Sequence, residues 1–132
     1  MKNNRKKVMI LTNHSYMLYR FRKELIEELM KNYDVVLSMP FVGHHEDFIN
    51  MGLRCIETKM ERRGVNPIHD FSLMKFYKKI LQEENSDLVI TYSIKPNVYG
   101  GLMCEKLNIP FYANVQGLGT AFQKPGLAQF AT

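Results

Sequence analysis

The 132-residue sequence predicts an α/β fold, in which helices cover both faces of a parallel sheet. Short hydrophobic segments of strand length alternate with segments that repeat hydrophobic residues at helical spacing. Right-handed crossovers between five such strands give the order 3-2-1-4-5. Polar or glycine-containing segments follow four of the expected strands, at the edge where open α/β sheets bind ligands. We therefore expect a three-layer sandwich with a binding site along that edge.

The first strand is expected at residues 8–12, and an amphipathic helix follows at 17–32. Hydrophobic residues recur there at helical spacing, and the expected buried stripe is Leu18, Phe21, Leu25, Ile26, Leu29 and Met30. The outer face of this helix is expected to carry Arg22, Lys23, Glu27 and Lys31.

The second strand is expected at residues 34–39, where Pro40 ends it. A short helix at 44–51 is terminated by Gly52. The third strand then occupies 53–58, and the alternation of strand and helix continues.

A polar loop at 59–67 leads to a helix at 71–84, for which Asp70 is the expected N-cap. The buried stripe of this helix is expected to be Leu73, Phe76, Tyr77, Ile80 and Leu81. A fourth strand follows at 87–92.

Pro96 suits the first position of the next helix, because its missing N–H has no partner there in any case. Gly100 and Gly101 are unfavourable in a helix, so we expect either the sheet or a ligand to approach their backbone closely. A fifth strand is expected at 111–115. The sequence after it resembles a helix cut at its first turn, so residues 1–132 are expected to be a single domain truncated at its C-terminus.

The composition excludes several classes of protein. The sequence is 45% hydrophobic, enough for one core, and has no run near the roughly 20 apolar residues of a membrane span. The N-terminus lacks a signal-peptide core, which indicates a cytoplasmic protein. Cys55 and Cys104 lie far apart in apolar stretches, and we expect two buried thiols rather than a disulfide or zinc site.

The net charge of +5 is concentrated at the N-terminal end. Residues 1–31 hold eight Lys and Arg against three Glu, whereas the remainder is balanced at ten of each sign. This basic region either is ordinary solvated surface or faces anionic lipid headgroups. No nucleic-acid-binding motif accompanies it, so we expect no nucleic-acid partner.

Known nucleotide-binding signatures are absent from the sequence. The turn after the first strand is not GxGxxG, no acidic residue ends the second strand, and GxxxxGK[ST] does not occur. His44, His45 and His69 have no spacing that suits a metal pair, and we expect them to be surface or capping residues. The sequence therefore predicts neither a nucleotide cofactor nor a metal site.

Four segments supply the candidate site. His14 follows the first strand, and it either binds an anion at the helix N-terminus there or caps that turn. Arg62 and Arg63 form an anion clamp or a solvated turn, and Lys95 precedes the Pro96 helix. The glycines of the 117–120 segment let backbone amides approach a ligand closely.

These segments, taken together, resemble the N-terminal half of bacterial glycosyltransferases of family 4. The likeness is carried by KVMILTNH at 7–14, ERRGVNP at 61–67, ITYSIKPNVYG at 90–100 and NVQGLG at 114–119, and it spans nearly the whole chain. The family implies the Rossmann-like N-terminal half of a two-domain GT-B fold. It also implies a hexosyltransferase of capsule, lipopolysaccharide or exopolysaccharide synthesis.

The resemblance implies the roles of the candidate residues. His14 is the expected catalytic residue, beside the acceptor hydroxyl with Asn13 and Ser15. Acceptor-binding residues are expected to be Asn13, Ser15, Arg62, Arg63, Tyr92, Lys95 and Asn97. The loop of Gly117, Leu118, Gly119 and Thr120 would line the cleft that faces a donor-binding domain.

The resemblance also implies the partners. The acceptor would be a saccharide on a polyprenyl diphosphate, and the donor a nucleotide-sugar that needs no metal ion or other cofactor. The basic N-terminal region would attach the protein peripherally to the inner face of the membrane. The C-terminal donor domain of the family is missing here, so this segment alone is expected to be inactive.

The sequence leaves two other functions open. The chain could be a stand-alone α/β module that binds a nucleotide or an anionic metabolite without catalysis. An epimerase acting on nucleotide-sugars shares the GT-B architecture and likewise needs two domains.

Overall fold

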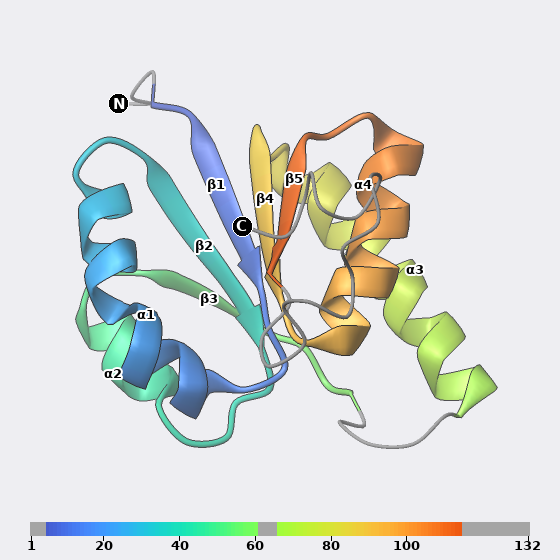
Figure 1. The fold of residues 1–132 in the computed structure, drawn as a ribbon, viewed down its shortest axis with the longest axis horizontal. Coiled ribbons are helices and arrows are strands. Elements are labelled where there is room, and N and C mark those ends of the chain that lie inside the picture. The colour runs from blue at the N-terminus through green and yellow to red at the C-terminus, as the bar shows by residue number, and fades with distance from the viewer. Residues whose placement is uncertain (1–4, 61–65, 115–132) are drawn as a thin grey trace.

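The computed structural model describes residues 5–60 and 66–114, which form a five-stranded parallel sheet between two layers of helices (Figure 1). The strand order is β3-β2-β1-β4-β5, as the sequence predicts. The strands are β1 (Lys7–Leu11), β2 (Asp34–Met39), β3 (Arg54–Glu57), β4 (Leu88–Tyr92) and β5 (Phe111–Asn114). The helices are α1 (Ser15–Met30), α2 (His45–Asn50), α3 (Pro67–Glu84) and α4 (Gly101–Leu107), and the π-helical turn η1 (Pro96–Gly100) precedes α4. The expected three-layer α/β fold is confirmed.

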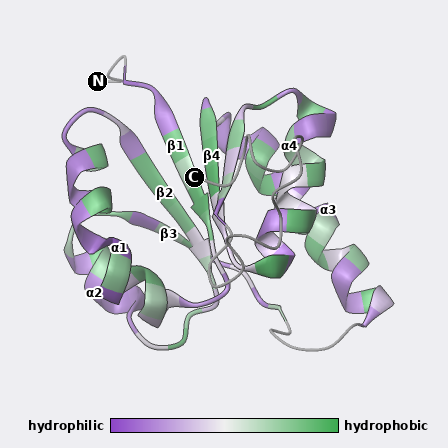
Figure 2. Cartoon of the chain, viewed as in Figure 1, coloured by the Kyte–Doolittle hydropathy of each residue, from purple (hydrophilic) through white to green (hydrophobic). Residues whose placement is uncertain are grey.

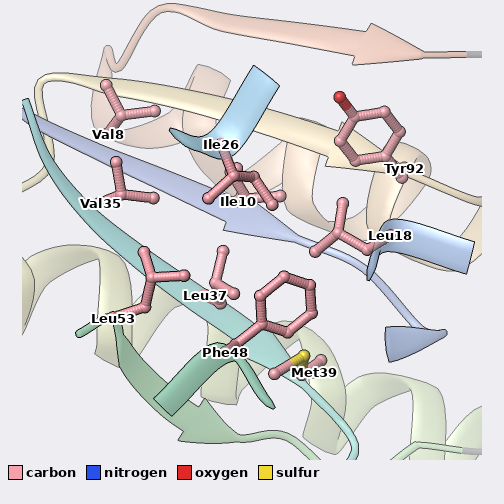
Figure 3. Close-up of a cluster of buried hydrophobic side chains, with 10 residues drawn as sticks. All are labelled: Val8, Ile10, Leu18, Ile26, Val35, Leu37, Met39, Phe48, Leu53 and Tyr92. Carbon is pink, nitrogen blue, oxygen red and sulfur yellow. The ribbon is translucent and has the colours of Figure 1, made fainter. Parts of the chain in front are cut away.

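Alternate residues of β1 enter different cores, because successive side chains of a strand point to opposite faces. Val8 and Ile10 pack with α1 and α2, in the cluster drawn in Figure 3. Met9 and Leu11 pack on the other face, with α3 and α4. Hydrophobic residues accordingly follow one another in the central strands β1, β2 and β4, whereas each helix mixes hydrophobic and hydrophilic residues (Figure 2). Both faces of β1 are therefore apolar, as expected for the central strand of a covered parallel sheet.

Helix α1 buries a narrower stripe than its sequence predicts. Leu18 and Ile26 are buried, but Phe21 and Leu25 are 51% and 40% exposed, so their expected burial is wrong. Leu25 instead borders an open hollow with Ile90 and Tyr112, on the β4–β5 side of the sheet. The helix contacts the sheet along the line of Leu18 and Ile26, which leaves one flank of its apolar stripe uncovered.

Helix α3 begins earlier than expected. Asn66 is its N-cap, and the Asn66 side chain accepts a hydrogen bond of 3.3 Å from the backbone N–H of His69. Asp70, the expected cap, is a buried residue of the first turn and pairs elsewhere. The expected cap is wrong because Asn66 is also a good capping residue and Pro67, directly after it, suits the first helical position.

The two glycines of the η1–α4 segment allow close packing against the sheet. A Cβ at Gly100 would lie 2.6 Å from Leu11 Cδ1, and one at Gly101 would lie 2.9 Å from the ring of Phe111. Of the two explanations left open by the sequence, the sheet is the one that approaches this backbone. The cost of glycine in the helix is offset by the closer contact with β1 and β5.

Neither cysteine has the environment of a reactive thiol. Cys104 is buried, Cys55 is half-buried, and both are free. Burial raises the pKa of Cys55 to about 11 and that of Cys104 to about 12. Both thiols therefore stay protonated at neutral pH, in agreement with a structural role.

Candidate functional site

A polar hollow lies at the carboxyl ends of β1 and β4, where the strand order reverses direction. Open α/β sheets bind ligands at this switch point. The hollow has a volume of about 260 Å³. Its lining residues are Thr12, Asn13, His14, Met17, Leu18, Arg22, Tyr92 and Ser93.

His14 occupies the N-cap of α1 and is half-buried. Its Nδ1 accepts a hydrogen bond of 3.4 Å from the backbone N–H of Met17, and its own backbone N–H donates to Thr12 Oγ1 at 3.2 Å. A neutral imidazole that accepts at Nδ1 carries its proton on Nε2. The ring therefore caps α1 and, in this tautomer, has the chemistry of a hydrogen-bond donor at Nε2.

Arg22 brings a positive charge to the hollow, although the sequence places it on the outer face of α1. Its guanidinium carbon lies 5.6 Å from the ring centroid of Tyr92, and the side chain is half-buried. The outer-face expectation is wrong, because α1 turns this flank towards the end of β4. Burial raises the pKa of the Tyr92 hydroxyl and the Arg22 charge partly offsets this, so the phenol is neutral at physiological pH.

Ser93 has an unusual backbone conformation directly after β4. Its φ of 82° lies in the left-handed region, which is unfavourable for a residue with a side chain. Its carbonyl oxygen accepts a hydrogen bond of 2.9 Å from the N–H of Asn97, which helps to hold this turn. The conformation places Ser93 beside Asn13 and His14 at the hollow.

Ser15, predicted to lie near the acceptor hydroxyl, is buried and directed into the protein. Its hydroxyl donates to the carbonyl oxygen of Val42 at 2.5 Å and accepts from the backbone N–H of His44 at 3.0 Å. These bonds join the start of α1 to the loop after β2. Its position favours support of the rim over direct contact with a ligand.

Lys95 is also engaged inside the protein. Its Nζ donates to Asp70 Oδ1 at 2.9 Å, and the Tyr99 hydroxyl donates to Asp70 Oδ2 at 3.0 Å. The hydrogen bond from Lys95 holds the pKa of Asp70 below its usual range, and Tyr99 acts in the same direction. Both members of the ion pair are buried, so this cluster ties the first turn of α3 to η1.

Asn97 joins three elements at the same edge. Its Oδ1 accepts from the Thr91 hydroxyl at 2.6 Å, and its Nδ2 donates to the carbonyl oxygen of Asn114 at 2.8 Å. The Asn114 side chain donates in turn to the Thr91 carbonyl oxygen at 3.3 Å. This network connects the ends of β4 and β5 to η1, and it occupies the polar groups of Asn97.

The structure thus brings together part of the predicted set. Asn13, His14 and Tyr92 line one hollow, whereas Ser15, Lys95 and Asn97 have partners within the fold. Predictions for the remaining residues, Arg62, Arg63, Gly117, Leu118, Gly119 and Thr120, lie outside the described residues and stay predictions.

Sequence reasoning placed Ser93 in a polar segment at the ligand-binding edge without giving it a role, and it missed Arg22 as a lining residue. The signal for Ser93 was its place directly after a strand. No comparable signal marks Arg22, because its side of α1 depends on how the helix is rotated against the sheet.

The described part of the chain shows no cluster of three or more histidine, cysteine, aspartate or glutamate residues suited to a metal ion. Within the same ranges, none of the helices has both the length and the apolar character needed to cross a bilayer.

The expected resemblance to glycosyltransferases is confirmed by comparison with known proteins. The chain is 25% identical, over 122 residues, to N,N'-diacetylbacillosaminyl-diphospho-undecaprenol alpha-1,3-N-acetylgalactosaminyltransferase of Campylobacter jejuni. The match covers 91% of this chain and 32% of that protein, so the chain spans about a third of its curated relative. No protein-family profile matches the chain.

Two solved structures have the same fold. A glycosyltransferase from Rickettsia africae superposes with a TM-score of 0.70 at 17% identity, over 96% of this chain and 35% of that one. Acinetobacter baumannii MurG superposes with a TM-score of 0.63 at 15% identity, over 96% of this chain and 40% of that one. At these identities the likeness concerns the fold alone, and the matching Rossmann-like domain makes up 40% and 35% of those two chains.

Proposed function

We propose that this chain is the acceptor-binding domain of a glycosyltransferase that transfers a sugar from a nucleotide-sugar to a saccharide on a polyprenyl diphosphate. The observation that carries the proposal is the likeness to the Campylobacter enzyme along 91% of the chain. That protein's name describes an acceptor with a diphospho-undecaprenol carrier. The donor-binding part would belong to another region of the same protein, since the chain spans 32% of this relative.

The chemistry of the hollow between β1 and β4 supports this function. Arg22 supplies a fixed positive charge, and the N-terminal end of α1 adds the partial positive charge of the helix dipole. Both suit the diphosphate of the acceptor or an anionic group that develops during transfer. Asn13, Ser93 and Nε2 of His14 offer hydrogen bonds for sugar hydroxyls.

In this proposal His14 positions or polarises the reacting group as a hydrogen-bond donor. Its Nδ1 bond to the Met17 N–H holds the ring in place, so binding requires little further ordering of the side chain. The reaction needs no metal ion or other cofactor, since fixed charges of the protein take that part. The enzyme would act at the inner membrane face, where a lipid-linked acceptor resides.

The test compares Arg22→Ala with Arg20→Ala in the full-length protein. Arg20 is exposed on the same helix and donates to the Tyr16 hydroxyl, so its removal is a matched loss of charge. We expect Arg22→Ala to raise the KM for the polyprenyl-diphosphate acceptor by about 10- to 100-fold, because a hydrogen bond to a charged group is lost. Arg20→Ala should change this KM by less than about twofold.

The alternative is a stand-alone module that binds a nucleotide or an anionic metabolite. A wild-type protein that transfers no sugar, together with a chain that binds a free nucleotide tightly by itself, would favour this alternative. Equal effects of the two arginine variants on the acceptor KM would instead remove Arg22 from the acceptor site while leaving the activity intact.

A further inference from the structure

Ser93 combines an unfavourable backbone conformation with a place at the hollow between β1 and β4. Three of the described residues other than glycine have a positive φ. Two of these, Asn85 and Asn108, are the C-caps of α3 and α4, where the left-handed conformation is ordinary and asparagine tolerates it. Ser93 has a φ of 82° and directly follows a strand, so no helix end accounts for its conformation.

Backbone strain of this kind persists only where the surrounding structure holds the residue, and strained residues cluster at active and ligand-binding sites. Ser93 lines the hollow, and its hydroxyl forms no hydrogen bond with the described part of the chain. The strain therefore has no return in an internal bond of this side chain. It leaves the hydroxyl open to a ligand in the hollow.

Asn97 holds the chain at two points around the strained residue. Its backbone N–H donates to the carbonyl oxygen of Ser93 at 2.9 Å, and its Oδ1 accepts from the Thr91 hydroxyl at 2.6 Å. One residue thus anchors positions 91 and 93 together. The short segment between these anchors has little freedom to relax to a more favourable conformation.

Asn97 is itself part of a closed set of hydrogen bonds. Its Nδ2 donates to the carbonyl oxygen of Asn114 at 2.8 Å, and Asn114 Nδ2 donates to the carbonyl oxygen of Thr91 at 3.3 Å. We call Thr91, Asn97 and Asn114 the β4–β5 clamp, because it joins the ends of β4 and β5, which lie side by side (Figure 1). Each member bonds to the other two, and such a network holds its members more firmly than a single bond would.

The β4–β5 clamp lies behind the hollow and not in it. Thr91 is buried, Asn97 and Asn114 are half-buried, and none of the three is among the described residues that line the hollow. A change in the clamp therefore reaches a ligand there only through the neighbouring residues that do line it, Tyr92 and Ser93.

We propose that Asn97 is a positioning residue for acceptor binding. Through the β4–β5 clamp it holds Ser93 in the left-handed conformation, which presents the Ser93 hydroxyl to the acceptor before the acceptor arrives. This inference rests on the proposed function and deepens it, because it divides the work at this turn between a residue that contacts the acceptor and residues that act through it. Asn97 thereby contributes to acceptor affinity without touching the acceptor.

The first test changes the clamp without touching the hollow. Thr91→Val in the full-length protein keeps nearly the same side-chain shape but removes the hydroxyl that bonds to Asn97, whereas Thr91→Ser keeps that hydroxyl. We expect Thr91→Val to raise the acceptor KM by about 3- to 10-fold with kcat changed by less than about twofold. Thr91→Ser should restore the KM to within about twofold of the wild-type value.

Thr58→Val is the matched control for this test. Thr58 is buried directly after β3, and its hydroxyl is hydrogen-bonded to that of Ser38, so the same chemical change is made away from the hollow. This variant should lower the Tm about as much as Thr91→Val does and leave the acceptor KM within about twofold. An acceptor KM for Thr91→Val as close to wild type as that of the control would overturn the positioning role.

A double-mutant cycle asks whether the clamp acts through Ser93. Ser93→Ala removes the hydroxyl and should raise the acceptor KM by about 3- to 10-fold. If the clamp acts through this hydroxyl, Thr91→Val adds less than about twofold in the Ser93→Ala protein. Two effects that multiply in the double variant would show that the clamp does not act through Ser93, and would overturn the proposal.

Ser93→Gly tests the strain itself, apart from any activity. Glycine adopts a positive φ without strain, so this variant should have a Tm about 2 °C above that of Ser93→Ala while sharing its raised acceptor KM. A variant that is more stable and binds its acceptor less well has the opposite signs expected of a purely structural residue. A Tm equal to that of Ser93→Ala would overturn the role of strain.

The outcomes separate this inference from the proposed function. A full-length wild-type protein that transfers no sugar to a polyprenyl-diphosphate acceptor would reject the enzyme, and the positioning role would fall with it. Wild-type transfer with a normal acceptor KM in Thr91→Val would reject the positioning role alone and leave the enzyme standing.

Discussion

The turn after β1 and the turn after β4 end at the same edge of the sheet, but they use their polar side chains differently. The first turn directs Asn13 and His14 to the hollow. The second turn directs Lys95 and Asn97 into the fold, where they pair with Asp70 and with the ends of β4 and β5. The division is not complete, since Ser15 of the first turn is bonded within the fold and Ser93 of the second lines the hollow, but most of the polar side chains of the second turn serve stability.

The difference has a geometric cause. After β1 the chain enters α1 directly, so side chains at the helix start remain at the switch point of the sheet. After β4 it enters the η1–α4 segment, in which Gly100 packs closely on β1 and Gly101 on β5. That close approach brings Lys95 beside the first turn of α3, and the buried lysine needs a counter-charge, which Asp70 provides.

Of the predictions that follow from this comparison of the two turns, the largest effect is a loss of stability in Lys95→Ala. This change leaves the Asp70 carboxylate buried without its charge partner, and we expect the free energy of unfolding to fall by about 3 kcal/mol. Urea denaturation measures the change. Lys79→Ala, a surface control on α3, should alter it by less than about 0.5 kcal/mol. A loss for Lys95→Ala as small as that of the control would show that the two turns do not differ in this way.

His14→Asn should affect activity and leave stability nearly unchanged. Asparagine can cap α1 as histidine does, but it lacks the Nε2 donor. In the full-length protein we expect kcat to fall by about 10- to 100-fold, as for the loss of a strong hydrogen bond in the transition state. The Tm should move by no more than about 2 °C.

The control for this prediction is His14→Ala, which removes both the cap and the donor. It should show the same loss of kcat. Its Tm should also be lower, because the lost cap reduces the free energy of unfolding by about 1 kcal/mol. Normal turnover by His14→Asn would reduce His14 to a capping residue.

The smallest expected effect is on stability in acid. Because the folded-state pKa of Asp70 is lowered by Lys95, its contribution is present above its ordinary pKa of 3.8. It is lost as the pH falls through the lower folded-state value, so stability should decline below about pH 3.8. Asp70→Asn should flatten this decline in urea midpoints measured from pH 7 downwards. An acid slope identical to that of the wild-type protein would argue against a native Asp70–Lys95 ion pair in solution.

The hollow between β1 and β4 could be located from the sequence, because the strand order and the polar turns both follow from local patterns. Asn13, His14 and Tyr92 were found in this way. Arg22 could not be found, since the helical pattern of α1 does not determine how far the helix is rotated against β1 and β2. The same rotation explains why Phe21 is exposed although it belongs to the apolar stripe.

The sequence did not predict which residues pair with the buried charges. Asp70 and Lys95 are 25 residues apart. From its neighbours in the sequence, Asp70 was interpreted as a helix cap and Lys95 as an anion-binding residue. The groove between α3 and α4 was hidden for a similar reason, since Lys106 joins Lys75, Lys78 and Lys79 along it only when α4 packs beside α3. The net charge of a segment gives the number of charged residues, but it does not show which of them lie on the same surface.

The sequence by itself determined the elements, their order in the sheet and the edge that carries the candidate site. These follow from periodicity, the handedness of crossovers and the direction of parallel strands, which act locally or by general rule. Only the tertiary structure decided which polar side chains remain open to a ligand and which are used within the fold. That choice depends on contacts between residues distant in sequence, because a buried charge or hydroxyl is stable only where packing brings it a partner.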